Sequence, residues 1–217
     1  MDSDFRLETK TVRLGARMPD ALTRAVELLR QGDLVAFPTD TVYGVGAHAF
    51  LEEAVARLYR VKGRPADQPI ALLLPDAAAM ESVCTNIPPL AWQIAERFWP
   101  GGLSLVLARS KAVPDRVTAG GSTVAVRVPD HPLVRAICRE LEAPLAASSA
   151  NCHGLPPPVT ADEVEAALAG RVSLILDGGR CQGGVASTVL DLTVSPPSIL
   201  RRGLVTAEQL AGILQEM

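Results

Sequence analysis

Residues 58–74 read LYRVKGRPADQPIALLL and contain one complete change from helix to strand. The apolar residues upstream recur at helical spacing over 51–59, which predicts a helix there. The run 70–74 is short, wholly apolar and followed by a proline, which is typical of a strand covered on both faces. Lys62 and Arg64 flank the glycine between the two elements. Two cations are therefore expected beside a buried strand.

Helical and extended patterns alternate along the rest of the chain. Asp20 is the predicted N-cap of the first helix, and Thr160 and Thr206 each open a capping box. Many strands interleaved with helices predict an α/β fold: one domain over residues 1–217, with a mixed sheet. The further helices are predicted at 20–30, 76–84, 89–98 and 131–141 and after the two capping boxes, and the strands at 34–37, 103–108, 123–128, 145–147, 174–176, 188–192 and 199–201.

Composition narrows the class of protein. The chain has 217 residues, 48% of them apolar, and a formal charge of −3. This balance argues against a surface that binds nucleic acid or membrane throughout, but it leaves room for a local cationic cavity. The N-terminus has no basic start and no apolar core of a signal peptide, and no apolar run reaches the ~18 residues of a membrane span. The four cysteines and three histidines show no metal-ligand spacing, so we expect a cytoplasmic protein without a bound structural metal.

Polar residues interrupt the apolar pattern at 38–46, PTDTVYGVG. Thr39, Asp40 and Thr41 lie between a predicted strand and two glycines, where a backbone can approach a ligand closely. The alternative is a turn that begins at the proline, with Asp40 hydrogen-bonded to its own backbone. Local sequence leaves both interpretations open.

The strand 123–128 contains a further polar insertion. Alternation places Thr123 and Arg127 on one face of an apolar strand, where an unpaired guanidinium would cost several kcal/mol. Its partner is either a structural carboxylate or an anionic ligand.

Other polar residues lie at the edges of predicted strands: Ser149 and Asn151 after 145–147, Ser187 before 188–192, and Arg201 at the end of 199–201. Such edges are where α/β sheets usually bind ligands. Together with the cations they predict a cavity for phosphate and carboxylate groups. The chain has no Walker A loop, GxGxxG, GxSxG or SxxK motif, so catalysis by positioning and charge neutralisation is expected.

Several ordered segments resemble the YrdC family of threonylcarbamoyl-AMP synthases. The resemblance covers about 14–210 and is carried by PTDTVYGVG (38–46), KGRPADQP (62–69), RFWPGGLSLVL (97–107), STVAVRVPDHP (122–132), SSANCHG (148–154), STVLDL (187–192) and ILRRG (199–203). It implies a twisted mixed sheet with flanking helices around a positively charged cavity. The implied enzyme is a nucleotidyltransferase that converts L-threonine, bicarbonate and ATP, with Mg2+, into threonylcarbamoyl-AMP and pyrophosphate.

The resemblance also implies roles for individual residues. Lys62 and Arg64 would be catalytic and contact the ATP phosphates, and Arg127 would hold the threonine carboxylate. The further ATP-binding residues would be Gln68, Thr123, Ser149, Asn151 and Arg201, and the further threonine-binding residues Thr39, Thr41, Ala147 and Ser187. The implied partners are a transferase complex for the t6A modification of tRNA and tRNA itself, with no membrane. We expect the short form of the family, without an added C-terminal domain.

Two other functions remain open at this stage. Related domains make carbamoyl-adenylate, although usually inside longer chains with zinc-binding modules. A non-catalytic RNA-binding module is the second alternative, although aromatic residues make up only 4% of the chain and would supply few stacking platforms.

Overall fold

The computed structural model describes residues 9–215, which form a mixed α/β fold around one ten-stranded sheet. The helices are α1 (Ala21–Arg30), α2 (Glu52–Lys62), α3 (Met80–Val83), α4 (Pro89–Phe98), α5 (Asp115–Thr118), α6 (Pro132–Leu141), α7 (Ala161–Leu168) and α8 (Ala207–Gln215). The strands are β1 (Val12–Gly15), β2 (Val35–Phe37), β3 (Gly44–His48), β4 (Ala71–Leu73), β5 (Leu103–Ala108), β6 (Thr123–Arg127), β7 (Leu145–Ser149), β8 (Leu174–Asp177), β9 (Thr188–Asp191) and β10 (Ser198–Arg201).

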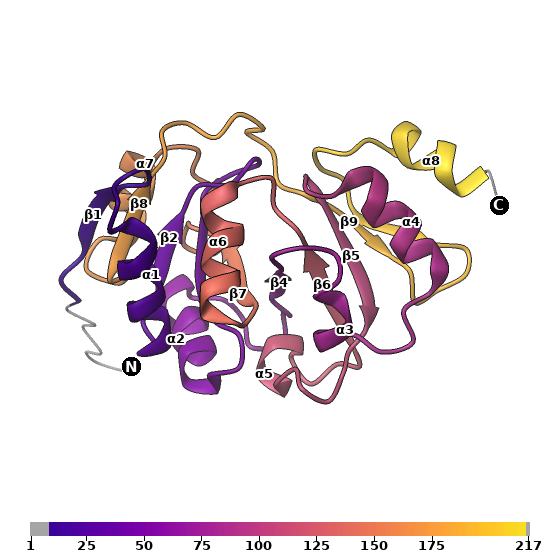
Figure 1. Cartoon of the computed structure of the whole chain (residues 1–217), viewed down its shortest axis with the longest axis horizontal. Helices are drawn as coiled ribbons and strands as arrows, with labels where there is room; N and C mark the ends of the chain where they lie inside the picture. The colour runs from indigo at the N-terminus through magenta and orange to yellow at the C-terminus, as the bar shows by residue number, and fades with distance from the viewer. Residues whose placement is uncertain (1–8, 216–217) are drawn as a thin grey trace.

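The strands lie in the order β1-β8-β2-β3-β7-β4-β6-β5-β9-β10. In Figure 1 this order runs from β1 and β8 on the left, through β7 and β4, to β6 and β5 on the right. Four pairs are parallel (β1 with β8, β2 with β8, β4 with β6 and β5 with β9), and the other five are antiparallel. The predicted mixed sheet is thus confirmed. Neighbours in the sheet are often far apart in the chain, so segments distant in sequence meet at its centre.

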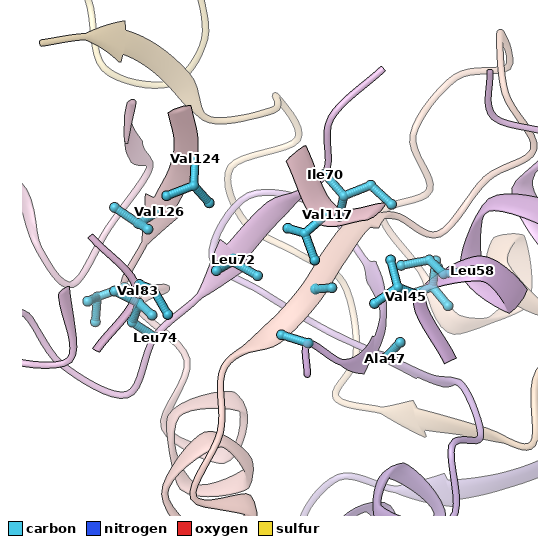
Figure 2. Close-up of a cluster of buried hydrophobic side chains, with 14 of the residues drawn as sticks. Val45, Ala47, Leu58, Ile70, Leu72, Leu74, Val83, Val117, Val124 and Val126 are labelled. Atoms are coloured by element: carbon cyan, nitrogen blue, oxygen red, sulfur yellow. The ribbon is translucent and has the colours of Figure 1, made fainter. Parts of the chain in front are cut away.

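One face of the sheet is apolar from β8 to β9. Alternate residues of the central strands point into this core, together with side chains from α2, α3, α5 and α7. Figure 2 shows its middle, where Leu72 of β4 lies between Val126 of β6 and Val45 of β3. The removal of these side chains from water is the main contribution to the stability of the fold.

The opposite face is covered differently in its two halves. Helices α1 and α6 pack over β8, β2 and β7 and form a second core with Phe37, Leu145 and Leu174. Leu73 of β4 lies at the edge of this core. Beyond it, residues of β5, β6 and β9 on the same face line a cavity. The functional site therefore lies where the helical cover of this face ends.

The structure adds three elements that the sequence patterns do not predict: β1, β3 and α5. β3 contains Gly44 and Gly46, which we expected to let the backbone approach a ligand. A Cβ added at Gly44 or Gly46 would lie 2.8 or 2.9 Å from the ring of Phe37 on β2. The two glycines make room for this ring. Strand β3 was not predicted because glycine weakens the sequence pattern of a strand.

Some boundaries also differ. The 76–84 helix is reduced to α3 (Met80–Val83), and α2 extends as far as Lys62. Both capping boxes form, at Thr160 and at Thr206. Asp20 occupies the N-cap position of α1, but its side chain makes no capping hydrogen bond, so that part of the prediction was wrong.

Candidate active site

The cavity has a volume of about 490 Å3 and is bounded by β4 to β7, β9, β10 and the loops that follow β2 and β7. Its charged lining residues are three arginines, Arg64, Arg127 and Arg201, and no Asp or Glu side chain is among the lining residues that the structure describes. It is thus electropositive, and anions are its natural ligands. The other polar lining residues are Thr39, Thr41, Ser104, Ser148, Ser149, Asn151 and Ser187.

Arg127 is the most constrained of the three arginines. It is only 6% exposed, and its guanidinium contacts three different groups. Nε donates to the carbonyl of Gly101 (2.8 Å) and Nη1 to Oγ1 of Thr41 (3.0 Å). Nη2 donates to Oδ1 of Asp40 at 2.6 Å, which closes a salt bridge. Burial lowers the pKa of Arg127, and the charge of Asp40 opposes that shift. The structural carboxylate, one of the two partners left open above, is therefore present.

The loop after β2 holds Asp40 and Thr41 in place. Oγ1 of Thr39 accepts from the backbone N–H groups of Thr41 (3.1 Å) and Val42 (3.3 Å), so Thr39 rather than Asp40 stabilises the local turn. The backbone N–H groups of Gly183 and Gly184 donate to the carbonyls of Asp40 and Thr41. The glycine-rich segment 178–184, which has no Walker motif, thus supports this loop.

A second network of hydrogen bonds links β5, β9 and β10 at the cavity wall. The Oγ atoms of Ser104 and Ser187 lie 3.0 Å apart, and Arg201 donates from Nη2 to Ser187 Oγ (3.0 Å) and from Nε to the Ser187 carbonyl (3.0 Å). Burial lowers the pKa of Arg201, and the nearby charge of Arg64 adds to the effect. These bonds fix the hydroxyl of Ser187 between two strands.

Lys62 lies just behind the lining. Its side chain is buried, and Nζ donates to the carbonyls of Ser149 and Asn151, the latter at 2.7 Å. Burial, with a smaller contribution from the charge of Arg64, lowers the pKa of Lys62 to about 8. The lysine thereby ties the end of α2 to the turn after β7.

Arg64 lies beyond Gly63, which adopts a left-handed conformation with φ of +60°. Its guanidinium donates to the carbonyls of Gln68 (3.1 Å) and Pro69 (2.8 Å), so it braces its own loop and carries no carboxylate partner among the described residues.

Asn151 presents an acceptor inside the cavity. Its Nδ2 donates to the carbonyls of Cys152 (2.9 Å) and Leu155 (2.6 Å), which settles the orientation of the amide. Oδ1 is buried and without a partner in the described structure. Because an unpaired buried acceptor is costly, this atom is suited to a donor group of a ligand.

Comparison with known proteins identifies the family. The Sua5/YciO/YrdC family model, described as "Telomere recombination", matches residues 27–203. The chain belongs to the Sua5/YciO/YrdC family. A threonylcarbamoyl-AMP synthase from Pyrococcus abyssi is 44% identical over 193 residues, which are 89% of this chain and 57% of that protein. One from Bacillus subtilis is 44% identical over 194 residues, 89% of this chain and 56% of that protein.

Solved structures of family members agree with the fold. P. abyssi Sua5 complexed with L-threonine has a TM-score of 0.92 and 41% identity, and the match covers 96% of this chain and 62% of that one. Escherichia coli YciO has a TM-score of 0.81 and 25% identity, over 92% of this chain and 97% of that one. The chain spans somewhat more than half the length of the first curated relatives that it matches.

The structure brings most of the predicted site residues together. The lining includes Thr39, Thr41, Arg64, Arg127, Ala147, Ser149, Asn151, Ser187 and Arg201. Lys62 lies next to it, as described above. Two further predicted residues, like Lys62, lie outside the lining. Thr123 is two residues before the lining residue Ala125 on β6, and Gln68 uses its carbonyl to accept from Tyr59 and Arg64.

The sequence patterns missed one residue of the site and one contact. Ser104 lines the cavity, and the available signal was a lone hydroxyl within the apolar strand LSLVLA. Asp40 was noticed, but its partner Arg127 lies 87 residues away in the chain, so no local pattern could have joined them.

A second hollow of about 340 Å3 lies beside α2 and α5 and contains none of the predicted site residues. Within residues 9–215, no group of three or more His, Cys, Asp or Glu side chains is placed to hold a metal ion. None of the helices described there is long and apolar enough to cross a membrane.

Proposed function

We propose that this chain forms threonylcarbamoyl-AMP and pyrophosphate from L-threonine, bicarbonate and ATP. The observation that carries the proposal is a cavity with three arginines and no lining carboxylate, in a fold shared with a Sua5 that binds L-threonine. The curated relatives named threonylcarbamoyl-AMP synthase support the same activity.

The cavity offers two adjoining regions for the two larger substrates, called its two ends below, and they meet at the hydrogen bond between Arg201 and Ser187. Arg64, Arg201 and Lys62, with Ser149 and Asn151 nearby, form the end suited to a triphosphate, because its cations contact only carbonyl and hydroxyl oxygens. Arg127, Thr41 and Ser187 form the end suited to threonine, with Thr39 and Ala147 beside them. Gln68 and Thr123 would extend the nucleotide end if their side chains turn toward it.

The proposed reaction has two bond-forming steps. The ammonium group of bound threonine first loses a proton. The resulting amine attacks carbon dioxide derived from bicarbonate, loses a second proton and becomes a carbamate. A carbamate oxygen then attacks the α-phosphorus of ATP, and the bond from that phosphorus to the bridging oxygen breaks as pyrophosphate leaves. Arg64 and Arg201 are placed to stabilise the charge that develops on the phosphate oxygens, a contribution of typically 10²–10³ in rate for one such group.

Mg2+ is expected to accompany ATP. The cavity lining offers hydroxyls and the unpartnered Oδ1 of Asn151 but no carboxylate, so the nucleotide phosphates would supply most of the ligands. Bound there, the ion would neutralise part of the phosphate charge. The protein residues keep the tasks of orienting the two substrates and excluding water.

The proposed product is a mixed anhydride that must pass to an acceptor. We infer that a transferase complex for the t6A modification of tRNA consumes it, in the cytoplasm.

Pyrophosphate release from ATP by the purified protein tests the proposal, with L-threonine and bicarbonate omitted in turn. Release that requires both, with serine and glycine much poorer, is the expected result. Release with carbamoyl phosphate in the absence of threonine would assign the chain to carbamoyl-adenylate formation instead. No turnover of ATP, together with tRNA binding that falls steeply with salt, would indicate an RNA-binding module.

A further inference from the structure

The three arginines of the cavity differ in their counter-ions. Arg64 donates to the carbonyls of Gln68 and Pro69, and Arg201 to the carbonyl and hydroxyl of Ser187. Neither contact carries a negative charge, so both guanidiniums keep their full charge for a ligand. Arg127 alone among the three forms a salt bridge within the described residues, with Asp40.

The Asp40–Arg127 pair is built into the wall rather than exposed at the surface. The side chains of Arg127 and Asp40 are 7% and 14% exposed, and their closest atoms lie 2.6 Å apart. Asp40 Oδ1 also accepts from the backbone N–H of Asp130 at 3.1 Å. His131 lies near this carboxylate, and burial lowers the pKa of its imidazole, which favours the neutral form. Asp40 therefore cancels the charge of Arg127 before a ligand arrives, and the positive charge that remains nearby is that of Arg201, which the proposed function assigns to the phosphates.

The hydrogen bonds of Arg127 leave room for a ligand. Its Nε, Nη1 and Nη2 each donate once within the protein, to Gly101, Thr41 and Asp40. A guanidinium has five N–H groups, so one N–H remains on each terminal nitrogen. Two such groups can contact a carboxylate at two points, while the charge of that carboxylate meets a guanidinium whose own charge Asp40 already balances.

We propose that Asp40 is a specificity-determining residue: by neutralising Arg127, it makes this end of the cavity select a zwitterionic amino acid over an anion of the same shape. The inference rests on the proposed function. It states what distinguishes the threonine end of the cavity from the triphosphate end. An anion without an ammonium group would leave an uncompensated negative charge in a buried place, which is costly. A zwitterion brings its own positive charge and leaves the site neutral.

Equilibrium binding to the unaltered protein gives the first test. L-Threonine and (R)-3-hydroxybutyrate have the same carboxylate, hydroxyl and methyl groups, but only threonine has the amine. We expect 3-hydroxybutyrate to bind at least about tenfold more weakly, since one charge at close range in a site of low dielectric constant is worth at least that factor. Equal affinity for the two compounds would overturn the inference without any variant.

Substitution of Asp40 gives the second test. In Asp40→Asn the side chain keeps its shape and its acceptor oxygen but loses its charge, so 3-hydroxybutyrate should bind more tightly. We expect the preference for threonine to fall at least about tenfold. Asp40→Glu, which restores the charge, should retain the preference even if both affinities decrease, and a thermal melt of each variant checks that it is folded.

The matched control is Asp130→Asn. This removes the same charge from a neighbouring position whose side chain is exposed, and it should leave the preference unchanged. An equal loss in both Asn variants, or in both Asp40 variants, would overturn the inference. If the unaltered protein binds neither threonine nor another amino acid, the proposed function fails first, and the inference fails with it.

Discussion

Lys62 is the residue whose burial makes the sharpest quantitative prediction. It is 2% exposed, and its pKa of about 8 lies well below the ordinary value of 10.5. Between these two values the unfolded chain holds a proton that the folded protein releases, so the free energy of unfolding should rise with pH. The full shift corresponds to about 3 kcal/mol, at 1.36 kcal/mol per pKa unit.

The assay is urea unfolding of the unaltered protein and of Lys62→Met at several pH values. Buried thiols such as Cys84, whose pKa is raised to about 12 by burial, change stability in the opposite direction, but they are common to both proteins. The difference in unfolding free energy between the two proteins therefore isolates Lys62. From pH 7.5 to pH 9.5 this difference should change by about 2 kcal/mol in favour of the unaltered protein.

A difference that stays constant over this pH range would refute the reasoning. It would mean that Lys62 titrates at its ordinary pKa and is not held in the dry contact with the carbonyls of Ser149 and Asn151. Lys62→Met also leaves those two carbonyls without a donor, at about 1–3 kcal/mol each. This adds a difference in unfolding free energy between the two proteins that does not depend on pH and does not affect the test.

Three further predictions concern the cavity and its support. Arg64→Ala should lower kcat/KM for ATP by about 10²-fold or more in the pyrophosphate assay, whereas a variant with unchanged turnover would exclude it from the phosphate end. Arg127→Ala should mainly raise the KM for threonine, and a selective effect on the KM for ATP would reverse the placement of the two substrates. Gly46→Ala should destabilise the fold by about 1–3 kcal/mol, measured by urea unfolding, because the new Cβ would lie 2.9 Å from the Phe37 ring. Phe37→Leu in the same chain should recover part of that loss, and an additive loss in the double variant would argue against the clash.

Some of the molecule could be predicted from local patterns because these report local geometry. Alternation in β5 and β6 indicates which residues face the core, and the structure places Ala125 and Arg127 together on the cavity side. The capping box at Thr160 predicts the start of α7 for the same reason, since its hydrogen bonds span only a few residues. Strand β3 was missed because its glycines depend on the ring of Phe37 on the neighbouring strand.

The amino-acid sequence by itself determined the fold class, most of the elements and most of the polar residues that line one cavity, because periodicity and ordered motifs are properties of the chain. Only the tertiary structure decided the charge of that site. It paired Arg127 with Asp40 and drew Lys62 onto the carbonyls of Ser149 and Asn151, 87 and 89 residues away. The order of strands in the sheet determines which strands and loops become neighbours, even when they are far apart in the chain. Those neighbours in turn determine which counter-ion or hydrogen-bond partner a buried charged group contacts.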